Sequence, residues 1–139
     1  MSETLNFSIQ LPVYPERVYR AWLDGAEQAR ITGSPASIEG RVGGHFSALD
    51  GAASGEITAL VPHDRISQTL SIANLAPGGQ IELRFEPTCT GTELVLTHSG
   101  IPNGKTPAVL RWWEETYFRP MTAYFDEIVG EYIADMGDG

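Results

Sequence analysis

Residues 92–125 read TELVLTHSGIPNGKTPAVLRWWEETYFRPMTAYF, and this stretch decides the architecture of the chain. Residues 92–99 alternate in character and predict a strand with one buried face. Thr106 then suits a helix N-cap, and Pro107 suits the first helical position. Beyond them, apolar residues recur at every third or fourth position and predict one long helix, with a stripe formed by Val109, Trp113, Tyr117, Met121, Tyr124, Ile128 and Tyr132.

Two features of this helix stand apart from the stripe. Pro120 lacks the amide hydrogen, and its ring clashes with the carbonyl four residues earlier, so a kink or a restart of the helix is expected there. The face opposite the stripe is acidic, with seven acidic residues and one basic residue, Arg119, between Trp112 and Gly139. Such a face is typical of a solvated surface, and a docking surface for a basic partner is the alternative.

Upstream, the chain begins with a strand and two short helices. Alternating apolar residues from Leu5 to Leu11 predict a half-buried strand. Pro15 suits the first turn of a helix, and because Tyr14 is a weak N-cap, packing is expected to hold that start. The segment Asp24–Glu27 resembles a capping box and predicts a second short helix that ends near Gly33.

The middle of the chain alternates between short apolar runs and turn signals. Five turns rich in glycine and proline separate six runs, at roughly 37–42, 45–49, 54–61, 65–74, 80–87 and 92–99. Short connections favour an antiparallel meander with one apolar face. Together with the first strand, this predicts an α+β fold with a seven-stranded antiparallel sheet, which the long C-terminal helix covers with its apolar stripe.

The composition is that of one globular domain. The chain has 139 residues, of which 42% are hydrophobic and 19% charged, and residues 1–139 are expected to form a single domain. Nine basic and 18 acidic residues give a formal net charge of −9, which argues against nucleic acid and anionic membrane as partners. Neither a signal peptide nor a membrane span is visible, so a cytoplasmic location is expected.

Cysteine and histidine offer little metal or redox chemistry. The lone cysteine, Cys89, excludes an internal disulfide, and its acidic neighbours disfavour a reactive thiolate. The three histidines lack the spacing of a metal site, so no metal is predicted, and no motif calls for a cofactor. Parity and turn position place His45 and His63 at the surface.

Several segments carry a family resemblance. PERVYRAW at Pro15–Trp22 resembles a family's first helix, and VGGHF at Val42–Phe46 resembles its glycine-rich turn into the third strand. Thr92–Pro102, followed by Trp112–Trp113 and Tyr124–Phe125, resembles the last strand and the final helix. Together these segments are similar to the START-like (SRPBCC) superfamily and, within it, to the AHSA1-like branch, the single-domain relatives of the activator of Hsp90 ATPase.

The resemblance implies the helix-grip fold, also described as START- or Bet v 1-like. In that fold a curved antiparallel sheet, two short helices after the first strand and a long C-terminal helix enclose a space that is a common ligand site. The side chains expected to face it share inward parity or the helix stripe: Phe46, Leu70, Leu83, Leu96, His98, Trp113, Tyr117 and Met121. For the aromatic stripe, a plain core role is the alternative to a ligand cradle.

Three functions from different classes remain open. The leading one is a binding module for a small hydrophobic or aromatic ligand. The second is a cyclase- or dehydratase-type enzyme with His98 as general acid or base, although a core histidine satisfied by a neighbour is the other interpretation of this residue. The third is an Hsp90-type co-chaperone or stress-response protein that would use the acidic helix face. A homodimer is compatible with all three.

Overall fold

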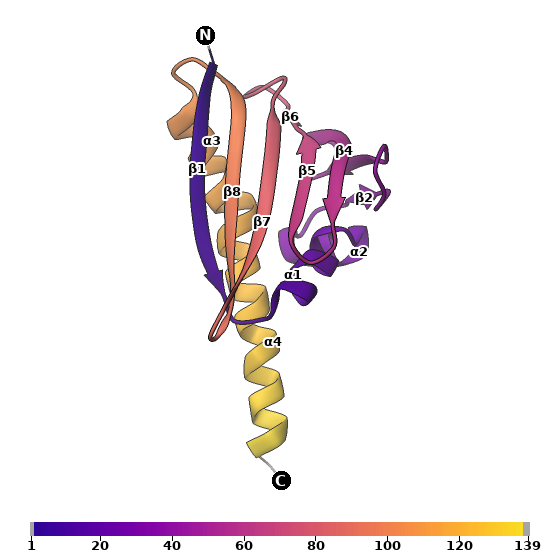
Figure 1. Cartoon of the computed structure of the whole chain (residues 1–139), viewed down its shortest axis with the longest axis vertical. Coiled ribbons are helices and arrows are strands. Elements are labelled where there is room, and N and C mark those ends of the chain that lie inside the picture. The colour runs from indigo at the N-terminus through magenta and orange to yellow at the C-terminus, as the bar shows by residue number, and fades with distance from the viewer. Residues whose placement is uncertain (1, 138–139) are drawn as a thin grey trace.

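The structure is a computed structural model that describes the backbone of residues 2–137 and the side chains of residues 2–130. Figure 1 shows a strongly curved antiparallel sheet with the helices on one side, which confirms the expected α+β helix-grip architecture. The strands are β1 (Ser2–Leu11), β2 (Ser37–Ile38), β3 (His45–Ala48), β4 (Ala53–Val61), β5 (Arg65–Thr69), β6 (Ser71–Ile72), β7 (Gln80–Thr88) and β8 (Gly91–Pro102).

The sheet has eight strands in the described chain, so the expected seven is wrong by one. Its order is β1-β8-β7-β5-β4-β3-β2, and β6 pairs with the beginning of β4. The predicted run 65–74 divides at Leu70, whose amide donates to Gly79 O at 3.0 Å. Both β5 and β6 pair with β4, but only β5 also pairs with β7, so the single predicted run forms two strands.

A β-bulge in β4 shifts the inward parity of that strand. Ile57 pairs with Gln68, whereas Ala59 pairs with Ser67, so the ladder has one extra residue between them. Within the predicted run 54–61, the alternation of Ile57, Ala59 and Val61 therefore does not keep all three side chains inward, and Val61 is 36% exposed. A bulge bends its strand, which helps this sheet to curve around the helix.

Two short helices follow β1: α1 (Pro15–Trp22) and α2 (Gly25–Thr32). The N-cap Tyr14 makes no side-chain cap hydrogen bond, as expected of a weak cap. Asp24 caps α2 by accepting from the amides of Ala26 and Glu27, and Gly33 ends it in the left-handed conformation, with φ of 78°. The capping box is only half formed, because the Glu27 side chain instead binds residues of α1 and the long helix.

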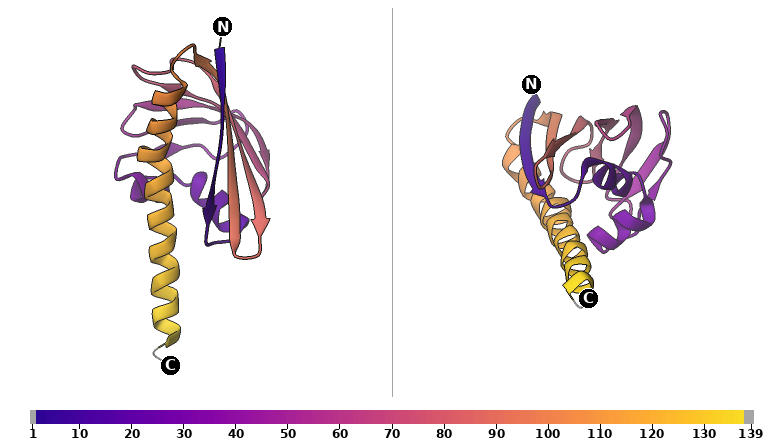
Figure 2. Two further views of the ribbon diagram at one scale, coloured as in Figure 1. Left: turned by 90° about the vertical axis from the view of Figure 1, so that its left-hand side faces the viewer. Right: turned by 60° about the horizontal axis from the view of Figure 1, so that its bottom comes forward.

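The long helix consists of α3 (Thr106–Trp113), the π-helical turn η1 (Glu114–Phe118) and α4 (Arg119–Gly137). The N-cap is Lys105, not Thr106 as expected, because the Thr106 hydroxyl donates to Glu3 Oε1 at 2.7 Å. The restart expected at Pro120 takes the form of a change in helix type, because the π-helical turn ends at Phe118 and the α-helix resumes at Arg119. Arg119 N donates to Glu114 O, and this π-type bond lets the helix pass Pro120 as one continuous rod (Figure 2).

The core lies between the concave face of the sheet and the helices (Figure 2). In the predicted run 80–87, the alternating residues Ile81, Leu83 and Phe85 are buried, and the helix stripe covers them as expected. The side chain of Tyr132, the last predicted member of the stripe, lies outside the described residues, as do those of Glu131, Asp135 and Asp138. Within the described residues no helix is both long and apolar enough to span a bilayer.

Candidate functional site

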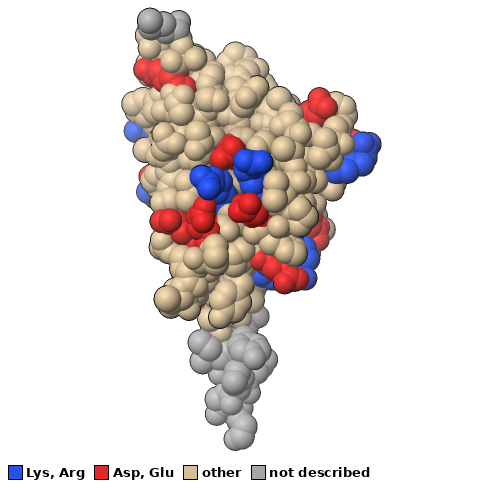
Figure 3. Space-filling model, viewed as in Figure 1, with Lys and Arg blue, Asp and Glu red and all other residues tan. Residues whose placement is uncertain are grey.

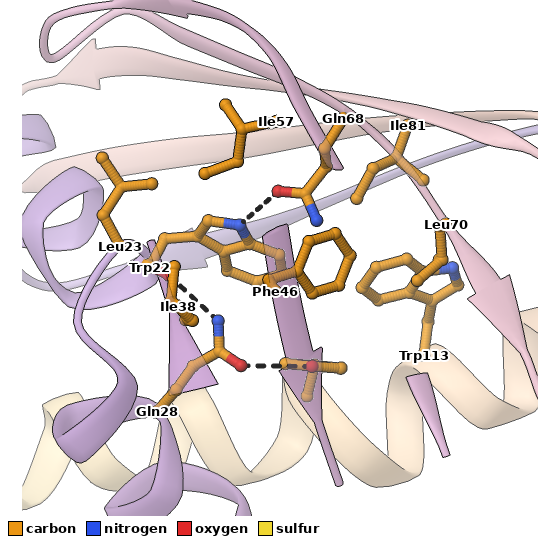
Figure 4. A pocket seen from close by; sticks show the side chains of 11 residues that line it. Trp22, Leu23, Gln28, Ile38, Phe46, Ile57, Gln68, Leu70, Ile81 and Trp113 are labelled. Atoms are coloured by element: carbon orange, nitrogen blue, oxygen red, sulfur yellow. Dashed lines mark hydrogen bonds between the residues drawn. The ribbon is translucent and has the colours of Figure 1, made fainter. Parts of the chain in front are cut away.

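A small interior cavity lies where α1, the sheet and η1 meet (Figure 4). Four aromatic side chains form much of its wall: Trp22 from α1, Phe46 from β3, and Trp113 and Tyr117 from the long helix. The ring centres of Trp22 and Tyr117 lie 5.2 Å apart, and those of Trp113 and Tyr117 lie 5.3 Å apart. These spacings are typical of packed aromatic pairs, so the wall is tightly organised.

Aliphatic side chains complete the wall: Leu23, Ile38, Ile57, Leu70 and Ile81. Leu23 and Ile38 are only half-buried, so they form the thinnest side of the cavity. The volume open to the centre of a water-sized sphere is about 10 Å³. Ligand pockets for drug-sized molecules measure about 300–1,000 Å³, so this conformation is closed and has room for about one water molecule.

Two buried glutamines bring polar atoms to this otherwise apolar cavity. Trp22 Nε1 donates to Gln68 Oε1 at 3.0 Å, and Gln28 Nε2 donates to the Trp22 carbonyl at 3.0 Å. Tyr117 donates its hydroxyl proton to Gln28 Oε1 at 3.2 Å. This network links the long helix, α2, α1 and β5, and each of the two glutamine side chains is less than 5% exposed.

Four of the eight expected ligand-site residues lie at the cavity wall: Phe46, Leu70, Trp113 and Tyr117. Leu83, Leu96, His98 and Met121 are buried as well, but they pack in the adjoining core and do not line the cavity. The sheet residues thus point inward as their alternation predicts. The cavity is smaller than one that all eight residues would line. Glycine at position 55 makes room for the Phe46 ring, since a Cβ there would lie 2.8 Å from Phe46 Cε1.

Sequence reasoning missed Trp22, Gln28 and Gln68 as members of the site. Gln68 shares strand parity with the buried Ile66 and Leu70, so a polar residue interrupts an inward apolar series. Buried polar side chains require partners, and such an interruption is a usable signal of a specific interior contact. Gln28 offered no comparable signal, because a glutamine on a short helix is usually exposed.

His98 lies on β8 with its imidazole enclosed in the core. Its side chain is completely buried, and its Nδ1 accepts a hydrogen bond of 3.0 Å from Trp113 Nε1. Burial lowers the pKa of His98 to about 4, so the ring is neutral at physiological pH. Its Nε2 makes no protein hydrogen bond and lies near the backbone of Gly79. The Trp113 bond matches the core-histidine interpretation, and the low pKa makes a weak general base.

We expect acidification to destabilise the protein through His98. The pKa is about 4 in the folded chain and near 6.5 when unfolded, so between these values the unfolded state binds more protons. The stabilisation is therefore complete above about pH 6.5 and is lost as the pH falls towards 4, by about 3 kcal/mol in total. Urea unfolding of the wild type from about pH 7 to about pH 4.5 measures this loss.

The control for this prediction is a pair of histidine variants. His98→Gln keeps an acceptor for Trp113 and should show a clearly shallower pH dependence, whereas His63→Gln, at an exposed turn, should follow the wild type. Equal pH dependence in His98→Gln and the wild type would show that His98 does not cause the loss.

A second polar cluster joins α1, α2 and α4 outside the cavity. Arg17 forms a two-pronged ion pair with Glu27, and the Tyr124 hydroxyl donates to Glu27 Oε2 at 2.7 Å. Burial by itself raises the pKa of Glu27, but the hydrogen bonds from Arg17 and Tyr124 outweigh it, and the net pKa is lowered. The Arg17 guanidinium also lies 5.4 Å from the centre of the Phe125 ring. This cluster fastens the long helix to the two short ones.

The surface carries side chains of both charges, and its possible metal ligands lie apart among the described residues. Figure 3 shows basic side chains beside acidic ones on the viewed face. Among the described ion pairs, the atoms of Arg84 and Glu86 lie 3.5 Å apart. His45 and His63 are exposed as predicted, and Cys89 is a free, exposed thiol. Among the described side chains, no three of His, Cys, Asp or Glu gather into a potential metal site.

The sequence of this chain is similar to those of known proteins. A model of the family described as Activator of Hsp90 ATPase homolog 1-like protein (AHSA1) matches residues 12–126. The Activator of 90 kDa heat shock protein ATPase homolog 1 of Homo sapiens is 31% identical over 113 residues, which is 80% of this chain and 33% of the human protein. The chain thus spans about a third of that relative's length.

Solved structures resemble the whole fold. The protein CV1439 from Chromobacterium violaceum is 26% identical, with a TM-score of 0.71, over 88% of this chain and 96% of that one. PFC0360w, an Hsp90 activator from Plasmodium falciparum, is 25% identical, with a TM-score of 0.74, over 94% of this chain and 96% of that one. The similarity therefore extends over the sheet and the long helix alike.

Proposed function

We propose, since this chain belongs to the family of Activator of Hsp90 ATPase homolog 1-like proteins, that it is a binding module for a small hydrophobic or aromatic molecule. The ligand would lie between the curved sheet and the long helix, at the cavity walled by Trp22, Phe46, Trp113 and Tyr117. A cytoplasmic location and a single domain over residues 1–139 belong to the same proposal.

One observation carries this proposal: two buried amides reach into an aromatic chamber. A purely structural core needs no polar groups there, because apolar packing alone stabilises it. A buried amide costs free energy unless hydrogen bonds satisfy it. Aromatic walls with a few fixed polar atoms are the usual lining of a small-molecule site. This combination supports ligand binding more directly than it supports catalysis, because no ionised side chain lines the cavity.

Binding has to open the cavity. Because only about 10 Å³ is free, a ligand must displace side chains, and the half-buried Leu23 and Ile38 are the easiest to move. The observed affinity equals the affinity of the open form multiplied by the fraction of molecules that are open, so the free energy of opening lowers it. We therefore expect modest affinity and a slower association than that of a preformed pocket.

The test is a thermal-shift screen against flavonoids, aromatic polyketides, fatty acids and sterols. A ligand at 100 times its dissociation constant should stabilise the folded state by about 2.7 kcal/mol and raise Tm visibly. NMR then locates the site, since the indole N–H signals of Trp22 and Trp113 should move more than that of Trp112, which does not line the cavity.

Two tryptophan substitutions provide the control. Ile38→Trp should block the thin side of the cavity and abolish the shift in Tm, whereas Val61→Trp, at a partly exposed position away from the cavity, should leave it intact. The proposal fails if no compound in the panel gives a saturable shift, or if both variants respond as the wild type does.

A protein partner is the second candidate function. The relatives named as Hsp90 activators favour an Hsp90-type chaperone as that partner. Three described acidic residues of the long helix, Glu115, Asp126 and Glu127, are exposed and would face a basic surface.

Calorimetry with purified Hsp90 tests this second candidate. We expect binding at low ionic strength that weakens as salt is added, and a further loss in the variant that combines Asp126→Lys with Glu127→Lys. Absence of binding at low salt would exclude this partner for the acidic face.

A further inference from the structure

The orientation of the Gln68 amide is determined by its neighbour. An indole N–H can only donate, so the bond from Trp22 Nε1 requires the oxygen of Gln68 on that side. The amide nitrogen then points away from Trp22 and into the space beside the Phe46 ring (Figure 4). Gln68 is 4% exposed, so this nitrogen is held inside the protein.

Gln68 Nε2 is the free donor of the cavity. It donates to no protein group among the described residues, although its oxygen is engaged. The other donors at the wall each donate at least once: Trp22 to Gln68, Trp113 to His98, Tyr117 to Gln28, and Gln28 to the Trp22 carbonyl. A donor that faces a cavity without a protein acceptor gains a hydrogen bond when an acceptor enters beside it.

The electrostatics of the wall restrict the charge of a ligand. No lining side chain is charged, and burial raises the pKa of Tyr117 far above neutrality, so its hydroxyl stays protonated. An anion or a cation would lose its hydration without gaining a counter-charge. A neutral molecule suffers no such loss.

The shape of the wall restricts the ligand further. The indole planes of Trp22 and Trp113 are inclined by only 26°, with their centres 6.4 Å apart, and Phe46 lies at the same cavity. Nearly parallel rings favour a flat guest that can stack in an offset geometry.

We propose that this cavity selects a neutral, flat aromatic molecule that carries a carbonyl-type acceptor, and that Gln68 Nε2 donates the hydrogen bond that recognises it. This inference rests on the proposed function, because it names the ligand class of the same site. Gln68 is the specificity-determining residue, while Gln28 positions Trp22 and Tyr117 through the network already described.

Three naphthalene probes of nearly equal size test this assignment by calorimetry. 2-Acetylnaphthalene carries the acceptor, 2-isopropenylnaphthalene replaces its oxygen by a carbon, and 2-naphthoate is an anion. The wild type should bind the acetyl compound about tenfold more tightly than the hydrocarbon, and the anion should not bind measurably. In the complex, the side-chain NH₂ signal of Gln68 should move downfield.

Two methionine variants separate recognition from packing. Gln68→Met keeps the length of the side chain but has no donor, so the tenfold preference should disappear. Gln80→Met is the matched control, because Gln80 is exposed on β7 and does not line the cavity, and it should keep the preference. Should Gln68→Met fail to fold, the wild-type probe ratio and the Gln68 NMR signal decide the question without it.

The outcomes distinguish this inference from the proposed function. Equal binding of the acetyl compound and the hydrocarbon, or a preference retained by Gln68→Met, would overturn the role of Gln68 and leave ligand binding standing. If neither neutral probe binds the wild type while the wider screen yields a ligand, the assigned class is wrong. If nothing binds at all, the proposed function fails together with the inference.

Discussion

Trp113→Ala is expected to lower the free energy of unfolding by about 3–5 kcal/mol, close to the upper range for a single core substitution. The Trp113 side chain is 1% exposed, and its ring stacks on Phe118 with centres 5.5 Å apart. Its removal leaves a large void and deprives His98 Nδ1 of its donor. Urea unfolding at neutral pH measures the loss.

Trp112→Ala is the matched control for this prediction. Trp112 is the neighbouring tryptophan on the same helix, but it is only half-buried and lines no part of the cavity. Its removal should cost less than half as much, because solvent already occupies part of its surroundings. Equal losses in the two variants would contradict the central position assigned to Trp113.

Added indole should restore much of the stability lost in Trp113→Ala. The void has the shape of the missing ring, and apolar cavities of this kind bind small aromatic molecules. Indole can also donate its N–H to His98, whereas 1-methylindole cannot, so indole should bind about tenfold more tightly. Thermal shift with both compounds checks this, and the absence of any rescue would mean that the void collapses.

Glu27→Gln is expected to destabilise the protein by about 3 kcal/mol, the second largest effect. The substitution leaves the Arg17 guanidinium without its carboxylate partner, and unpaired buried charges are costly. We place the value at the low end of the usual range, because the Arg17 side chain is 26% exposed and water can solvate part of it. Chemical unfolding at neutral pH provides the measurement.

The exposed Arg41–Glu39 pair offers the matched control. Its atoms lie 3.0 Å apart, but both side chains are largely exposed, so Glu39→Gln should change the stability by less than about 1 kcal/mol. Adding Arg17→Met to Glu27→Gln should bring no further loss, because it removes the orphaned charge. A Glu27→Gln variant as stable as Glu39→Gln would refute the anchoring role of the cluster.

The ion pair also has a defined pH signature. The pKa of Glu27 is lowered in the folded state, so the pair stabilises the protein above the unfolded value of 4.5, and this contribution is lost as the pH falls through the folded pKa. The loss begins at a lower pH than that of His98, whose window extends upward to about 6.5. The two contributions can therefore be separated by their pH ranges.

The order of strands and helices could be predicted from the sequence because periodicity and capping are local properties. The inward series on β7 and β8, the Asp24 cap and the Gly33 stop all depend on residues within a few positions of one another. The apolar stripe of the long helix likewise identifies the element that covers the sheet. These patterns also carry the family resemblance, which the match over residues 12–126 confirms.

Tertiary packing decided the rest. The bulge in β4 and the division of the 65–74 run arise because one sheet must curve around one helix, and no local pattern reports that curvature. The Glu27–Tyr124 and Gln28–Tyr117 contacts join residues that are 97 and 89 positions apart. Likewise, only side-chain packing determines that the cavity is nearly filled and that the Gln68 amide lies at its wall, because volume and orientation depend on neighbours that are far apart in the sequence.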